Sequence, residues 1–462
     1  MNTSQYVTRS LAAWIKACQS SDIPPEVRRE GVRTFFNWVG CAVGGARHET
    51  VDRALQAVTP FSGAPTATVI GRGERLDALH GALLNGISSH VLDYDDTHLK
   101  TIIHPAGPVA SALMAVAELR PVSGAELLHA LIIGVEVECR IGNSVYPEHY
   151  DRGWHITGTA GVFGAAAAVG KLIGLGEGKL VWALGIAATQ SSGLREMFGT
   201  MTKSFHPGRA AQNGALAAFM AEAGFDSSER GIEAPRGFAN VLSTKQDYSE
   251  ILGGLGDRWE ASLNSYKPFA CGIVIHPTID GCIQLREELG DAVEANASVE
   301  LTAHPLVLEL TGKTEPRTGL EGKFSVYHSA AAALLRADGS PTAFTDELVN
   351  DPQLMDLRRK VRATADPACD EDAVTIVVTL NDGRKFEKHV EHAIGSFARP
   401  LSDAQLETKF QRQASLVIGE DAARRLMEVS WSLPSLAEAG EVARQSVPDA
   451  PSMREPNRAV AR

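Results

Sequence analysis

The sequence lacks the features of a membrane-spanning or secreted protein. No uninterrupted apolar run reaches the roughly 18 residues needed to cross a bilayer, because glycine and lysine break the alanine-rich stretch from Ala160 to Gly174. The first residues show neither a basic segment followed by a continuous apolar core nor a small-residue cleavage site. We therefore expect no membrane contact and a cytoplasmic location.

Cysteine and net basic charge are also scarce. The 44 Lys and Arg residues are outnumbered by 56 Asp and Glu, and the resulting formal charge of −12 repels phosphate backbones. With no local basic stripe, we expect no nucleic-acid partner. No C-x-x-C pair occurs, which favours reduced and mostly buried thiols over disulfides or structural zinc. The six cysteines are Cys18, Cys41, Cys139, Cys271, Cys282 and Cys369.

What the sequence does contain is enough apolar material for two or three packed domains, with 44% hydrophobic residues in 462. From about Val7 to Gly224 the chain is rich in Ala, Leu and Gly and has no long β-branched alternation, which predicts a bundle of helices. Residues 83–91 show the spacing: Leu83, Leu84, Ile87 and Val91 recur at three- and four-residue steps. The same periodicity runs through residues 109–119, 127–141, 160–172 and 210–223.

The pattern changes after Ser265. Residues 299–310 are rich in β-branched side chains, and residues 375–380 and 385–390 flank an Asn-Asp-Gly turn, which predicts a β-hairpin. Helical periodicity returns with Asp403 as the expected cap. We predict a mainly α protein with a helical domain (residues 1–265 and 399–445), an α+β domain (266–398) and a disordered tail (446–462).

The densest group of reactive side chains follows the apolar helix at residues 83–91. Five ionisable or hydroxylic residues lie within six positions, at Asp93, Asp95, Asp96, Thr97 and His98. The apolar sequence on both sides predicts that they are buried and that their pKa values are shifted, as in a site. The alternative is a solvated helix end, which is the usual meaning of a charge cluster.

Three further segments contain candidate residues. His155 stands near the start of a Gly/Ala helix, whose free N–H groups suit a carboxylate, and its imidazole can act as an acid or a base. Lys203 lies in a segment of hydroxyl and cationic residues that suits a polyanion. Residues 266–272, followed by His276, lie at the expected domain junction, where binding sites are common.

Metal and nucleotide sites receive little support. There is no H-E-x-x-H motif, and residues 311–314 resemble a phosphate loop whose first glycine is replaced by Val307. Residues 71–73 lack the rest of a dinucleotide fingerprint, so we predict no cofactor and no metal. A metal-dependent hydrolase remains an alternative from composition alone. It would use Asp95, Asp96, His98 and His104.

Five separated segments together resemble the MmgE/PrpD family in order and spacing, and the resemblance extends from about residue 8 to residue 440. This family includes 2-methylcitrate dehydratase, cis-aconitate decarboxylase and iminodisuccinate epimerase. The segments are LLNGISSHVLDYDDTH, IIHPAGPVASALMAVAE, GTMTKSFHPGRAAQNG, YKPFACG and GSFARPLSDAQLETKF.

The resemblance implies a helical domain made from both chain ends, an inserted α+β lid domain, a homodimer, and an active site between the domains that needs no cofactor. It also implies a set of site residues. By position, the catalytic set is Asp93, His104, His155, Lys203 and Lys267, and the substrate-binding set is Thr97, Met201, Thr202, Tyr266 and His276. One departure matters: Gly272 stands where some members carry a histidine five residues after the lid lysine, and His276 follows four residues later. If His276 does not take the place of that histidine, the acid-base set differs and neither dehydration nor decarboxylation follows from the resemblance.

These residues predict proton transfer at a carbon next to a carboxylate in a small di- or tricarboxylate. The lysines would neutralise the charge that develops, and His104 and His155 would act as base and acid. We expect Asp93 to orient a histidine or to carry a proton. Epimerisation or dehydration of a succinate- or citrate-like acid is the primary prediction, with decarboxylation as an alternative. A non-catalytic helical binding protein is a further alternative.

Overall fold

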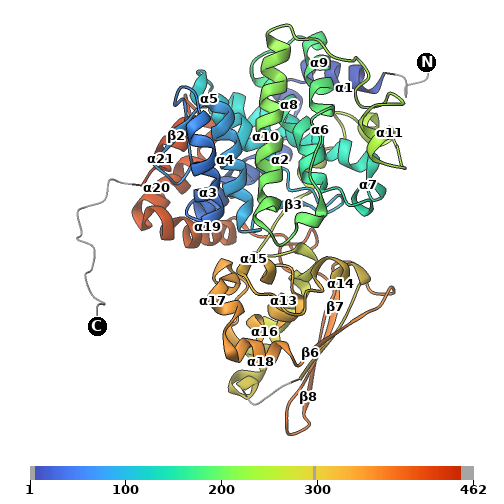
Figure 1. Ribbon diagram of the computed structural model, residues 1–462, viewed down its shortest axis with the longest axis vertical. Coiled ribbons are helices and arrows are strands. Elements are labelled where there is room, and N and C mark those ends of the chain that lie inside the picture. Colours follow the sequence, from blue (N-terminus) through green and yellow to red (C-terminus); the bar gives the residue numbers. More distant parts are fainter. Residues whose placement is uncertain (1–5, 295–297, 449–462) are drawn as a thin grey trace.

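The computed structural model describes residues 6–294 and 298–448. It consists of a large helical part and a smaller part of helices and strands that lies below it in Figure 1. Residues 449–462 of the predicted disordered tail lie outside the described residues. The helical part is built from both ends of the chain, because the red C-terminal helices pack beside the blue N-terminal ones. The predicted fold class is confirmed.

The helical part has a core in which all the long helices share apolar side chains. Its helices are α1 (Val7–Ala17), α2 (Pro25–Gly45), α3 (Glu49–Val58), α4 (Ala78–Val91), α5 (Ala106–Leu119), α6 (Gly124–Val145), α7 (Glu148–Asp151), α8 (Ile156–Leu172), α9 (Glu177–Ala188), α10 (Met201–Glu222), α11 (Phe238–Leu242), α12 (Ser249–Leu252), α19 (Asp403–Ile418), α20 (Glu420–Trp431) and α21 (Glu441–Gln445). Two short strands, β1 (Ala67–Thr68) and β2 (Arg75–Leu76), pair beside it.

Small residues allow helices α4 and α10 to pack unusually closely. A Cβ atom added to Gly86 would lie 2.5 Å from the Cα of Gly208, so neither position has room for a side chain. This contact sets the distance between the end of α4 and the start of α10. Asp77 caps α4 by accepting hydrogen bonds from the backbone N–H groups of Leu79 and His80, at 3.0 Å each.

The smaller part is a four-stranded sheet, in the order β6-β5-β7-β8, with α13 and α16 packed against it. Its strands are β5 (Ser298–Ala303), β6 (Val361–Ala365), β7 (Val374–Thr379) and β8 (Lys385–Val390). Its helices are α13 (His276–Leu289), α14 (Pro305–Thr311), α15 (Gly319–Gly322), α16 (Val326–Arg336), α17 (Asp346–Val349) and α18 (Pro352–Arg358). Strands β7 and β8 pair antiparallel, as the predicted hairpin requires.

Strand β5 covers only the first part of the β-branched segment 299–310 and ends at Ala303, because Pro305 begins helix α14 with a ring that suits a first helical position. One local prediction was wrong. The cap of α19 is Ser402 rather than Asp403: its hydroxyl accepts from the backbone N–H of Gln405, and the Gln405 side chain accepts from the N–H of Ser402.

The cysteines are free thiols, and all except Cys369 are buried. Across the described ranges, we find no helix with the length and apolar character that a bilayer span requires.

Candidate active site

A two-stranded ribbon positions the site where the two parts meet. Strand β3 (Asp96–His98) pairs antiparallel with β4 (Asn264–Tyr266), and the Lys267 backbone N–H then donates to the Asp95 carbonyl at 3.4 Å. The loop after α4 therefore lies against the segment that leads into the smaller part. Residues 93 and 267, which are far apart in sequence, become neighbours.

Asp93 accepts hydrogen bonds from two buried lysines. Its Oδ1 lies 2.9 Å from Nζ of Lys203 and 2.7 Å from Nζ of Lys267. Burial alone would raise the pKa of Asp93, but the two ammonium groups outweigh burial and hold the pKa well below its usual range. Its second oxygen, Oδ2, has no hydrogen-bond partner in residues 6–294 and 298–448. Two positive charges thus share one carboxylate.

The two lysines differ in their surroundings. Burial lowers the pKa of Lys203, despite the attraction of Asp93, and its ammonium lies 5.4 Å from the ring centres of both Phe198 and Phe324. Burial also opposes the charge on Lys267, yet Asp93 and Asp95 together raise the pKa of that lysine. Lys267 therefore keeps its proton, and its positive charge, to a higher pH than Lys203.

His104 is held in one tautomer. Its Nδ1 lies 2.8 Å from the backbone carbonyl of Asp96, which can only accept, so Nδ1 carries the proton. The Thr97 hydroxyl is 3.2 Å from the same nitrogen. Burial lowers the pKa of His104 well below its usual value, so the ring is neutral and its Nε2 has a free lone pair. That atom can act as a base.

His155 is the residue that precedes helix α8, and its backbone N–H donates to the carbonyl of Gly193 at 3.0 Å. The nearly inaccessible side chain is 1% exposed. Burial, with smaller contributions from His206 and Lys203, lowers the pKa of His155 well below its usual value. Its ring centre is 6.4 Å from that of His104, so two neutral imidazoles face one region.

His90, for which the sequence predicted no role, connects the charged groups of the site. Its Nδ1 lies 2.7 Å from the Asp95 carboxylate, and its Nε2 lies 3.0 Å from Nζ of Lys203. Since the carboxylate must accept, Nε2 is the acceptor for the lysine. His90 therefore orients Lys203 towards Asp93. The sequence signal that could have identified His90 is its position in the last turn of α4, three residues before Asp93.

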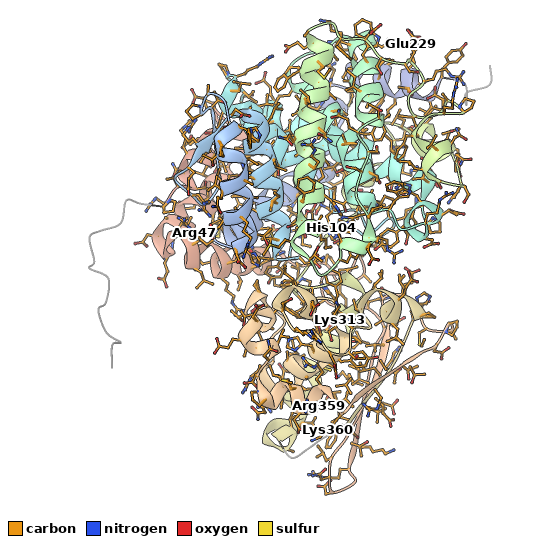
Figure 2. All side chains as sticks on the ribbon, viewed as in Figure 1. Arg47, His104, Glu229, Lys313, Arg359 and Lys360 are labelled. Atoms are coloured by element: carbon orange, nitrogen blue, oxygen red, sulfur yellow. The ribbon has the colours of Figure 1, made fainter. Side chains whose placement is uncertain are left out.

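A small cavity of about 30 Å³ collects these groups at the junction of the two parts, close to the His104 label in Figure 2. By volume it has room for about two water molecules. The helical part contributes Asp93, Ile102, His104, Tyr150, His155, Phe198 and Lys203, and the remaining lining residues are Lys267, Gly272, Ile273, Val274, Leu310, Thr311 and Phe324. All five residues of the predicted catalytic set line this cavity.

Two cavity residues have a strained backbone. Asp93 and Ile102 adopt positive φ values of 50° and 58°. Asp tolerates this region, but a β-branched residue there is a genuine outlier. Such conformations persist where the surrounding structure enforces them, and they cluster at functional sites.

The predicted substrate-binding residues lie outside the cavity lining. Thr97 contacts His104 instead, and the hydroxyl of Tyr266 lies 3.0 Å from that of Thr34 in the helical core. Thr202 is exposed, and Met201 lines a second cavity of about 880 Å³ between the two parts, which none of the site histidines reaches.

His276 does not occupy the space left by Gly272. It lies at the start of α13, with its ring 5.4 Å from that of Phe269. Both ring nitrogens are buried, and neither has a hydrogen-bond partner among the residues that the structure describes. Direct substrate contact is therefore unsupported for all five predicted substrate-binding residues in this closed arrangement.

The metal set considered from the sequence does not assemble. The ring nitrogens of His98 contact Thr101 and Glu260, at 2.7 Å and 3.1 Å, and so face away from the cavity. Within residues 6–294 and 298–448, the groups with ligand atoms close enough for a metal are His90, His104 and His155, and His90, Asp93 and Asp95. Both groups include His90, whose two ring nitrogens are already hydrogen-bonded to Asp95 and Lys203, so a cation would have to replace one of these partners.

Comparison with known families covers most of the chain. Residues 9–251 match the MmgE/PrpD N-terminal domain, and residues 269–434 match the MmgE/PrpD C-terminal domain. The chain belongs to the MmgE/PrpD family. The first match alone spans more than half of the chain, and the two together contain all the residues that line the cavity, except Lys267.

Curated relatives within the MmgE/PrpD family match at low identity over nearly their whole length. The cis-aconitate decarboxylase of Aspergillus terreus is 26% identical over 95% of both chains. The cis-aconitate decarboxylase of Mus musculus is 28% identical over 95% of this chain and 93% of its own. A probable 2-methylcitrate dehydratase of Saccharomyces cerevisiae is 21% identical over 86% of this chain and 84% of its own.

Proposed function

We propose that this protein is an enzyme that forms and protonates a carbanion-like centre next to a carboxylate of a small di- or tricarboxylate. The observation that carries the proposal is the pair of lysines on Asp93 beside two neutral imidazoles, at a cavity between the two parts of the molecule. The family relatives, which are named for reactions of tricarboxylic acids, support this class of substrate.

The lysines address the difficult step of this chemistry. Removing a proton, or carbon dioxide, next to a carboxylate leaves negative charge on the substrate, and preorganised cations in a site without water stabilise that charge. Lys203 and Lys267 are both buried and both line the cavity. The Lys203 ammonium is bonded to His90 and Asp93 and so keeps a third N–H group for a substrate carboxylate.

The histidines supply the proton transfer. The free lone pair on Nε2 makes His104 the candidate base, and His155, on another side of the cavity, is the candidate acid. Asp93 then has a positioning role towards the lysines, since its pKa is too low for a proton carrier near neutral pH.

Substrate entry requires the two parts to separate. The present cavity of about 30 Å³ is far smaller than a tricarboxylate, and Phe324 of the smaller part closes over Lys203 of the helical part. Opening would admit the acid, and closure around it would exclude water and strengthen every charge interaction.

Epimerisation, dehydration and decarboxylation all pass through the same carbanion-like intermediate. Epimerisation and dehydration remain the primary prediction, and decarboxylation is the second candidate. The names of the relatives favour decarboxylation. Gly272, which lines the cavity without a side chain, separates this chain from members that carry a histidine there, so the acid-base set rests on His104 and His155. We also propose a homodimer, which light scattering of the purified protein would test.

Incubation of the purified protein with a panel of acids in D2O tests the proposal. The panel contains cis-aconitate, citrate, 2-methylcitrate and substituted succinates, and proton NMR detects deuterium next to a carboxylate, loss of water and decarboxylation together. We expect one acid to be converted, and His155→Gln to lower its kcat/KM by at least about 10²-fold. His80→Gln, in a partly buried histidine outside the cavity, is the matched control.

Wild-type protein that converts and labels no acid of the panel would disprove the proposal. Elemental analysis belongs to the same experiment, because stoichiometric metal in the active protein, lost with activity on chelation, would favour the metal-dependent alternative.

A further inference from the structure

A histidine outside the cavity is hydrogen-bonded to the candidate acid. His206 lies on α10, three residues after Lys203, and its Nδ1 is 2.8 Å from Nδ1 of His155. The ring centres are 5.1 Å apart. Two nitrogens at this distance share one proton, so each ring determines the tautomer of the other.

The pair crosses the wall of the cavity. His155 lines the cavity, whereas His206 does not. Nε2 of His206 has no hydrogen-bond partner among the described residues, and it is not one of the buried unpaired polar atoms, so it is open to water. A continuous path therefore runs from solvent through both rings to Nε2 of His155.

A single glycine holds both rings in place. The carbonyl of Gly193 accepts the backbone N–H of His155, and a Cβ atom added to Gly193 would lie 3.2 Å from the ring of His206. Gly193 has a φ of +129°, a conformation that other residues rarely adopt. The close approach of the two histidines is thus built into the backbone.

His104, the other candidate proton carrier, has no such connection. Its Nδ1 donates to the Asp96 carbonyl, which cannot pass a proton on, and Asp96 is fully buried. Of the two cavity imidazoles, His155 alone is linked, within the described part of the chain, through a ring nitrogen to a titratable group that reaches solvent.

We propose that His206 is a positioning residue that relays protons between solvent and His155 while the site is closed. This inference rests on the proposed function, because a carbon that gains or loses a proton in so small a cavity needs a route for that proton. Burial lowers the pKa of His206 to about 4, so the resting ring is neutral and can both accept and donate.

The proton balance is closed over one cycle. In a decarboxylation, the electron pair left on the substrate carbon takes the Nε2 proton of His155. The Nδ1 proton of His206 then moves to Nδ1 of His155, and water protonates Nε2 of His206. In the open site, water then protonates Nε2 of His155, the Nδ1 proton returns to His206, and His206 releases its Nε2 proton to solvent. Epimerisation or dehydration would run the same path in the direction that the substrate requires.

Substitution of His206 by asparagine and by alanine separates relay from mere orientation. In His206→Asn, the amide nitrogen takes roughly the place of Nδ1 and keeps a hydrogen bond to His155, but it cannot pass a proton. We expect kcat to fall about tenfold or more with KM within about twofold. His206→Ala leaves space for added imidazole, which should restore turnover in proportion to its concentration.

His80→Asn is the matched control, since His80 lies outside the cavity and, like His206, is bonded through Nδ1, in this case to Asp77 at 2.6 Å. Thermal unfolding of each variant checks the fold. Wild-type kcat in His206→Asn, or no effect of imidazole on His206→Ala, would overturn the relay.

A measurement without substrate keeps this test separate from that of the proposed function. With ¹⁵N-labelled histidine, NMR should detect a coupling across the hydrogen bond between the two Nδ1 atoms, and its loss in His206→Ala identifies it. Absence of the coupling in the wild type would overturn the relay whatever the activity. If the wild type converts no acid, the proposed function fails, and a detected coupling still supports the proton path.

Discussion

Two buried groups of charges in the helical part differ in how completely their atoms are paired. Around Arg140, the guanidinium donates to Glu136 and to the carbonyls of residues 250, 251, 253, 254 and 258, and Glu136 also accepts from the N–H of Ala261 at 2.9 Å. Around Asp93, by contrast, one carboxylate oxygen has no partner in the described part of the chain, and the imidazoles of His104 and His155 each keep a nitrogen without one.

The difference separates structural charges from functional ones. A buried charge whose hydrogen bonds are all satisfied anchors the backbone around it, and removing it leaves orphaned groups. A buried group with an unpaired atom at a cavity is held ready for a ligand. Burial and a shifted pKa are common to both kinds, so incomplete pairing beside open space is the criterion that distinguishes them.

The strongest test of the comparison is Lys203→Met. We expect kcat/KM to fall by about 10²- to 10³-fold, as when one preorganised charge is removed from an anion-stabilising site. Stability should be retained, because Asp93 keeps Lys267 as its partner and the new side chain lies among the aromatic rings of Phe198 and Phe324. Steady-state kinetics and urea denaturation measure the two effects.

Lys171→Met is the control for this variant. The Lys171 ammonium donates to the carbonyls of Ile15, Lys16 and Cys18, and none of these residues lines the cavity. Its loss should lower the urea midpoint and leave turnover unchanged. A Lys203→Met enzyme with normal kcat/KM would remove Lys203 from the proposed mechanism.

Arg140→Met tests the other side of the comparison. Without the guanidinium, Glu136 and five carbonyls lose their buried partner, so we expect the free energy of unfolding to fall by about 3–5 kcal/mol. The kcat of the protein that remains folded should stay within about twofold of the wild-type value. Lost turnover at undiminished stability would show that complete pairing does not mark a purely structural group.

The sequence predicted which segments form the site, but not how they come together. The segments that line the site were identifiable, because reactive residue types interrupt apolar helices at His104, His155 and Lys203. Their assembly around one cavity depends on the β3–β4 pairing, for which strands of three residues leave almost no pattern. The predicted roles of these residues stay predictions until the variants are measured.

The direction in which a side chain points was harder to predict. Tyr266 and Lys267 are consecutive in an extended segment, so they face opposite sides, and only the lysine reaches the cavity. Thr202 precedes Lys203 in the first turn of α10 and is rotated onto the exposed face. His90 and His206 resembled ordinary helix residues, because their importance lies in hydrogen bonds to ring nitrogens that no sequence pattern records.

The smallest expected effect concerns Asp96, which combines the features of both groups because one of its carboxyl oxygens is hydrogen-bonded and the other is not. Its Oδ2 accepts from Ala106 and Asn264, at 3.0 Å and 2.7 Å, while Oδ1 is buried with no partner among the described residues. Burial, reinforced by Asp95, raises the pKa of Asp96 to about 7 from an ordinary value of 3.8. Near neutral pH this carboxyl is therefore partly protonated in the folded protein.

The sign of its effect on stability follows from proton uptake. Between about pH 4 and pH 7 the folded protein holds a proton on Asp96 that the unfolded chain has released, so this group lowers the free energy of unfolding as pH rises. Asp96→Asn keeps an oxygen for Ala106 and Asn264 and cannot ionise. Denaturation at several pH values should show that this downward contribution, up to about 1.4 kcal/mol per pH unit, is gone. Parallel pH profiles for the two proteins would mean that Asp96 ionises normally, and that an unpaired buried oxygen alone does not mark a perturbed group.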